Sequence, residues 1–144
     1  MLPSKITFTD WIHLSQRFFL TRWMQLPGVY ALAHFPTEVP SGKADPLIRE
    51  IIYYGESQNP LGIRLRNFIH SANTGKHAHS AGRHYHDIFH EIKDFLYIAV
   101  CDSPDILVAE ANDIRHDLKA HLIDGYNIKY SSYPRLLRAK PDKK

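Results

Sequence analysis

Three short apolar runs, separated by longer amphipathic stretches, restrict this chain to a mixed fold. The runs predict strands over 29–32, 49–54 and 95–100, and turn-forming Gly, Pro or Asp residues adjoin them. The second strand begins with Arg49 and Glu50, and its apolar part is 51–54. Continuous apolar runs of this length are typical of strands buried on both faces. We therefore expect a small β-sheet, with 95–100 as its central strand.

The stretches between the runs carry apolar residues at helical spacing. They predict helices over 8–26, 60–72, 84–90 and 106–125. Asn59 is a suitable N-cap for the second of these, and Gly125 is a suitable C-cap for the last. The sequence thus predicts an α+β fold with helices packed over the sheet.

Composition favours a single domain that needs no cross-links. The chain has 144 residues, of which 44% are hydrophobic and 23% charged, and it shows no internal repeat. We expect one domain over 1–144, with a frayed tail at 138–144. The single cysteine, Cys101, excludes a disulfide framework and a cysteine-based zinc site.

The same composition predicts a soluble, cytoplasmic protein without a membrane partner. No stretch approaches the roughly 20 apolar residues of a membrane span, and the N-terminus lacks the build of a signal peptide. Net charge is +3, and ten histidines add positive charge on mild acidification. Nucleic acid is therefore a permitted partner, although charge alone favours basic residues dispersed on a solvated surface.

Two tyrosine motifs and one arginine carry the functional signal. Gly28-Val29-Tyr30 and Tyr53-Tyr54-Gly55 lie on predicted strands, and Arg64 follows on a predicted helix. In this order and spacing, the chain from Gly28 to about Leu137 resembles the GIY-YIG nuclease family. The resemblance implies a mostly antiparallel three-stranded sheet flanked by helices. It also implies an endonuclease that hydrolyses DNA phosphodiester bonds with Mg²⁺ or Mn²⁺.

The resemblance assigns catalytic roles to Tyr30, Tyr53 and Arg64. The tyrosines would position or deprotonate the attacking water, with Tyr30 the better candidate base, provided that nearby cations lower a phenol pKa that is ordinarily near 10. Arg64 would bind the phosphate oxygens, since a guanidinium is their natural bidentate partner. The alternative is that both tyrosines simply pack in the core.

The family's metal-binding glutamate is not matched. Its position, ahead of a Leu-Ile pair, falls on Lys119, and the position of the family's C-terminal asparagine falls on Leu137. Asp113 and Asp117 share a helical face and are the predicted replacement ligands, or else they are solvated surface acids. A second hypothesis is therefore a degraded nuclease fold that binds nucleic acid or protein without cutting.

A basic, histidine-rich segment follows the second predicted helix. Its side chains would contact phosphates of the DNA backbone. The residues predicted for this role are Lys76, His77, His79, Ser80, Arg83 and His84. Two alternatives remain: a zinc site and adventitious surface histidines. The zinc site would draw on His77, His79, His84, His86 and His90.

Overall fold

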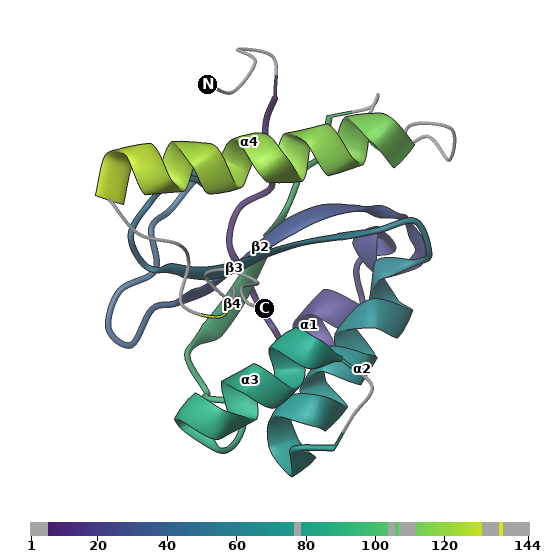
Figure 1. Cartoon of the computed structure of the whole chain (residues 1–144), viewed down its shortest axis with the longest axis vertical. Helices are drawn as coiled ribbons and strands as arrows, with labels where there is room; N and C mark the ends of the chain where they lie inside the picture. Colours follow the sequence, from purple (N-terminus) through teal and green to yellow (C-terminus); the bar gives the residue numbers. More distant parts are fainter. Residues whose placement is uncertain (1–5, 77–78, 104–105, 107–111, 131–135, 137–144) are drawn as a thin grey trace, which may run out of the picture.

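The sheet has four strands, all antiparallel, in the order β1-β4-β2-β3 (Figure 1). Its strands are β1 Ile12–His13, β2 Gly28–His34, β3 Ile51–Ser57 and β4 Leu96–Val100. The computed structural model describes residues 6–76, 79–103, 106, 112–130 and 136. The α+β class is confirmed, but the expected count of three strands is wrong because a segment near the N-terminus adds β1.

Strand β2 lies at the centre of the three long strands and is buried along its whole length. Side chains alternate between the two faces of a strand, so its apolar run supplies both layers of the core. Tyr30 and Leu32 belong to one hydrophobic cluster, and Val29 and Ala31 belong to the other. The run at 95–100 forms β4, which lies between β1 and β2 in the interior of the sheet, as predicted.

Helices cover both faces of the sheet (Figure 1). One face carries α1 Gln16–Phe19, the 3₁₀ helix η1 Arg22–Gln25, α2 Leu61–Thr74 and α3 Ser80–Phe89, and the other carries α4 Asn112–Tyr130. Leu118, Leu122 and Tyr126 hold α4 against its face. Within the described residues, no helix is both long enough and apolar enough to cross a membrane.

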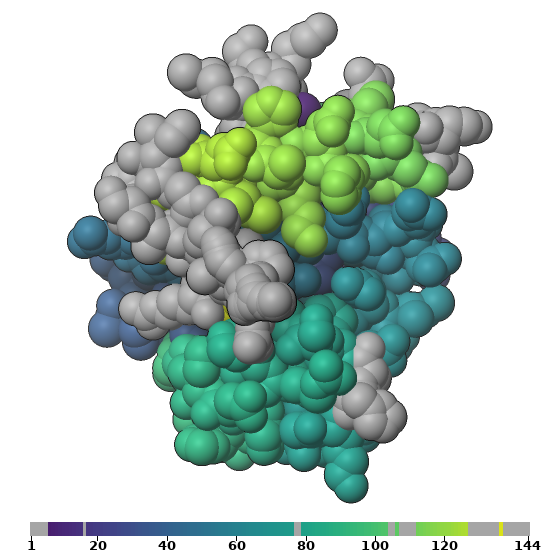
Figure 2. All heavy atoms as spheres, in the orientation of Figure 1, coloured from purple at the N-terminus to yellow at the C-terminus, as the bar shows by residue number. Residues whose placement is uncertain are grey.

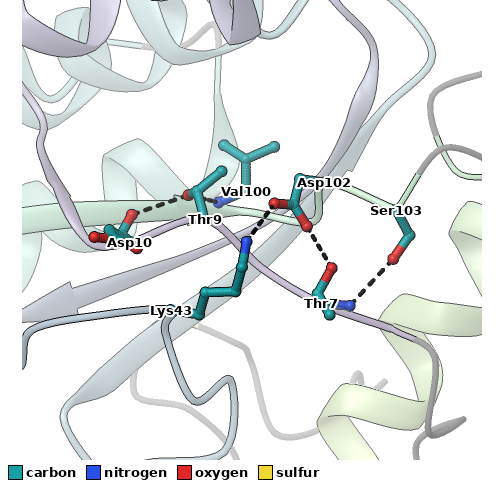
Figure 3. Close-up of polar contacts among 7 residues, drawn as sticks. All are labelled: Thr7, Thr9, Asp10, Lys43, Val100, Asp102 and Ser103. Atoms are coloured by element: carbon teal, nitrogen blue, oxygen red, sulfur yellow. Dashed lines mark hydrogen bonds and ion pairs between the residues drawn. The ribbon is translucent and has the colours of Figure 1, made fainter.

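The predicted helix over 8–26 is wrong. Residues before Leu14 run along the edge of β4 that β2 leaves open, where Thr9 N donates to Val100 O at 2.8 Å. Val100 N donates to Thr9 Oγ1 at 3.0 Å (Figure 3). An unpaired strand edge offers a full row of backbone donors and acceptors, and pairing with it outweighs helical spacing. The helical part of the segment is reduced to α1 and η1.

Helices α2 and α3 lie close to their predicted positions but begin elsewhere. Pro60 occupies the N-cap position of α2, and the backbone N–H of Asn59 donates to Ser57 Oγ at 3.1 Å. Helix α3 begins four residues before the predicted start, because His79 caps it: its Nδ1 accepts from Gly82 N at 3.2 Å.

Within the described residues, helix α4 covers Asn112–Tyr130, so it does not end at Gly125 as predicted. Gly125 lies within the helix, where a Cβ atom would come 3.1 Å from the Leu47 side chain. The glycine therefore permits close packing rather than a helix end. The predicted tail at 138–144 lies outside the described residues.

Candidate active site

A pocket of about 360 Å³ lies at the β3 edge of the sheet, where helices from both faces meet. Figure 2 shows the surface hollowed between α4, in yellow-green, and the teal helices α2 and α3. The described lining residues are Tyr53, Arg64, Ser80, Ala81, Arg83, His84, Asp87, Lys119 and Leu136. Strand β3 and three helices contribute side chains, so the pocket exists only in the folded chain.

The two predicted tyrosines lie next to each other on one face of the sheet, Tyr53 on the edge strand β3 and Tyr30 on the neighbouring β2. Leu32 pairs with Tyr53 across β2 and β3, which puts Tyr53 on the same face of the sheet as Tyr30, and the two phenol rings are 6.2 Å apart between centroids. Gly55 is opposite Tyr30, and a Cβ there would overlap the phenol. Tyr53 lines the pocket, whereas Tyr30 is fully buried behind it.

Burial governs the ionisation of both phenols. It raises the pKa of Tyr30 far above the ordinary value, and Tyr53 adds to the rise. Burial likewise raises the pKa of Tyr53. The positive charge of the Arg64 guanidinium lowers the pKa of both phenols, but by less than burial raises it. Tyr30 Oη has no well-formed hydrogen bond to any described residue. Both hydroxyls are therefore protonated at neutral pH, and Arg64 is electrostatically coupled to both.

His79 is a second buried polar side chain beside the tyrosines. Its ring lies 6.2 Å from Tyr53 and 5.4 Å from Phe68, centroid to centroid. Burial lowers its pKa to about 4, and Arg64 and Lys119 reinforce the shift. Since Nδ1 accepts the cap hydrogen bond, Nε2 carries the proton, and this buried N–H has no acceptor among the described residues.

Positive charge dominates the pocket wall. Arg64 from α2, Arg83 from α3 and Lys119 from α4 face it, with Asp87 as the single described carboxylate. No described carboxylate lies within ion-pair distance of these three cations. Burial lowers the pKa of Lys119, with Glu56 opposing and Arg64 reinforcing the shift. An anionic ligand such as a phosphate suits this charge.

The residues predicted to contact DNA divide into three groups. Ser80, Arg83 and His84 line the pocket. His79 is buried behind it as a helix cap, and Lys76 is exposed but does not line it. His77 lies outside the described residues.

The predicted metal ligands lie away from the pocket lining. Asp113 and Asp117 are exposed on α4, and neither lines the pocket. The described lining does not fit the Mg²⁺ or Mn²⁺ that the resemblance implies, because such ions need oxygen ligands and Asp87 stands among three cations. Nor does the described part of the chain contain a group of three His, Cys, Asp or Glu side chains placed to hold a zinc ion.

Sequence reasoning missed Asp87, whereas the resemblance had put Lys119 at the family's metal-ligand position, and Lys119 lines the pocket. Lys119 directly follows the buried Leu118 and stands one turn before Leu122, a spacing that puts it at the border of the apolar face of α4. That signal was present in the sequence. No protein-family model, no curated protein and no solved structure matches the chain.

Proposed function

We propose that this protein hydrolyses phosphodiester bonds in DNA, as the GIY-YIG nucleases that its sequence resembles do. One observation carries the proposal: Tyr53 and Arg64 line a cationic pocket, and Tyr30 packs directly behind Tyr53. The guanidinium suits the non-bridging oxygens of a phosphodiester, and the phenol that lines the pocket suits a water molecule.

The protonated phenols support a proton relay rather than a phenolate base. A water molecule held by Tyr53 Oη attacks the phosphorus, and the bond to the leaving oxygen breaks as the new P–O bond forms. The water proton passes to Tyr53 Oη while the hydroxyl proton of Tyr53 passes to solvent water, and the leaving oxygen, on the opposite side of the phosphorus, takes its proton from solvent. The phenol is therefore neutral before and after. We assign this step to Tyr53, not Tyr30, because Tyr53 lines the pocket.

Arg64→Met and Tyr53→Phe test the proposal on supercoiled plasmid and linear duplex DNA. Loss of a group that stabilises transition-state charge costs on the order of 10² to 10³ in rate. Arg66→Met is the matched control, since Arg66 is on the same helix but packs over the Phe19 ring at 4.7 Å. Tyr97→Phe is the control for loss of a strand hydroxyl. Cleavage that survives both test substitutions would show that the activity resides elsewhere.

Binding of DNA without cleavage is the second candidate function. The complete burial of Tyr30 and the raised pKa of both phenols favour it, because neither hydroxyl is a base at neutral pH. Its signature is DNA affinity that falls steeply with salt, together with intact DNA after incubation with EDTA, Mg²⁺ or Mn²⁺.

A further inference from the structure

We propose that the Lys119 ammonium group supplies the positive charge at the scissile phosphate that a divalent cation supplies in metal-dependent nucleases. This inference rests on the proposed hydrolysis. It means that the protein cuts DNA without a metal ion. The substrate class is unchanged, but the catalytic cation is part of the protein.

The position of Lys119 is the first observation behind this inference. Leu118 and Leu122 are buried against the sheet and hold this part of α4 in place. Lys119 lies between them in sequence, is half-buried, and lines the pocket together with Tyr53 and Arg64. A lysine anchored in this way presents its charge with less loss of side-chain freedom than one on an open surface.

The second observation is that Lys119 and Arg64 approach the pocket from opposite layers. Arg64 is on α2, under one face of the sheet, and Lys119 is on α4, over the other (Figure 1). A phosphate bound between them would have cations on two sides. Charge that builds on the non-bridging oxygens during water attack would be stabilised by both groups, while the proton follows the Tyr53 relay described above.

The third observation is the charge balance of the described lining. Arg64, Arg83 and Lys119 repel a divalent cation, and Asp87 is the single opposing carboxylate. Glu56, the acid that attracts Lys119, does not line the pocket, and its Oε2 lies 2.8 Å from His116 Nδ1. The side chains that line the pocket therefore suit direct contact with a phosphate. They do not suit a metal ion placed between the pocket and the phosphate.

The test is cleavage of plasmid and duplex DNA by the full chain, after removal of metals, in EDTA, Mg²⁺ and Mn²⁺. We expect cleavage to persist in EDTA and to fall by on the order of 10² in Lys119→Met. Lys119→Arg, which keeps the charge, should retain most of the rate. Lys93→Met, which alters a lysine outside the pocket lining, should match the parent. Circular dichroism melts confirm that each variant folds.

Mn²⁺ binding, followed by electron paramagnetic resonance, is a readout independent of cleavage. We expect no stoichiometric binding by the parent and a gain of binding in Lys119→Glu. Cleavage that stops in EDTA and returns with Mg²⁺ would overturn the role of Lys119 and leave the hydrolase proposal standing. Unchanged EDTA-resistant cleavage by Lys119→Met would also overturn it. Intact DNA in every condition would overturn the hydrolase proposal and this inference together.

Discussion

Single residues on β2 and β3 determine how closely the candidate active site is packed. Gly55 leaves the space that the Tyr30 phenol fills, and the strand register sets the two opposite each other. Tyr30 in turn packs against Tyr53, which reaches the pocket. The glycine of the second motif is therefore needed for space rather than for an unusual backbone angle.

Gly55→Ala should lower the free energy of unfolding by about 1–3 kcal/mol, because the added methyl group overlaps the Tyr30 ring. Urea denaturation measures the loss. In a Tyr30→Leu background the same substitution should cost less, since the ring edge and hydroxyl are gone, so the two substitutions should be coupled. Equal costs in both backgrounds would show that the Tyr30 ring does not limit the space.

His79 should make stability depend on pH. Its imidazole binds a proton near pH 6.5 in the unfolded chain but near pH 4 in the folded protein. Between these two pH values the unfolded state holds more protons than the folded state. The stability that depends on a neutral His79 is therefore fully present above about pH 6.5 and is lost as the pH falls toward 4. At 1.36 kcal/mol for each pH unit between the two values, the loss is on the order of 3 kcal/mol.

His79→Asn isolates this effect, because the Asn amide oxygen replaces Nδ1 as the cap acceptor and does not titrate. Urea denaturation at about pH 7 and about pH 4.5 should show a smaller drop in the variant than in the parent. His70→Asn, at an exposed histidine on α2, should keep the parental drop. Parallel behaviour of parent and His79→Asn would contradict a buried neutral imidazole.

At the scale of elements, the segment before Leu14 closes the open edge of β4. On the N-terminal side of β1, Thr7 Oγ1 donates to Asp102 Oδ1 at 2.6 Å, and Lys43 Nζ donates to Asp102 Oδ2 at 3.1 Å. Figure 3 shows these three side chains together. These contacts join residues about 60 and 95 positions apart in the chain. The segment is therefore part of the sheet layer and not a separate N-terminal helix.

Thr9→Val should destabilise the fold by about 1–3 kcal/mol, because Val100 N–H donates to Thr9 Oγ1 and would be left buried without an acceptor. Valine keeps the shape of threonine, so packing changes little. Thr9→Ser keeps the acceptor and should recover most of the loss. Thermal or urea unfolding measures both variants, and equal stability of Thr9→Val and the parent would show that water replaces the hydroxyl.

At the scale of the whole molecule, charge distribution matters more than net charge. The net formal charge is only +3, yet three cations converge on one pocket drawn from both helical layers. The small net charge therefore does not reflect the local excess of positive charge in the pocket, which suits an anion. We therefore expect the salt dependence of DNA binding to change when a cation of the pocket is substituted.

Arg83→Met should reduce the slope of log affinity against log salt for duplex DNA by about 0.9, the value for one phosphate contact. The measurement is made in the Tyr53→Phe background so that cleavage does not interfere. Arg66→Met should leave the slope unchanged, since Arg66 packs over Phe19 away from the pocket lining. Equal slopes for all three proteins would remove Arg83 from the proposed DNA-binding surface.

Local sequence patterns were enough to predict several parts of the candidate site. The apolar runs predicted β2, β3 and β4, and the spacing of Leu61, Leu65 and Phe68 predicted α2. Strand alternation and helical periodicity act over a few residues, so a sequence reveals them directly. The roles given to Tyr30, Tyr53 and Arg64 stay predictions, although the fold brings these side chains together.

Tertiary structure alone decided what the N-terminal segment became and which side chains share the pocket. Residues before Leu14 had helical spacing but paired with β4, because an open strand edge supplied hydrogen bonds that a local pattern cannot anticipate. Lys119 meets Arg64 through packing across the sheet edge, over 55 positions of chain. Local periodicity is encoded within a turn or two of chain, whereas pairing and convergence depend on contacts between distant segments that form only when the whole core assembles.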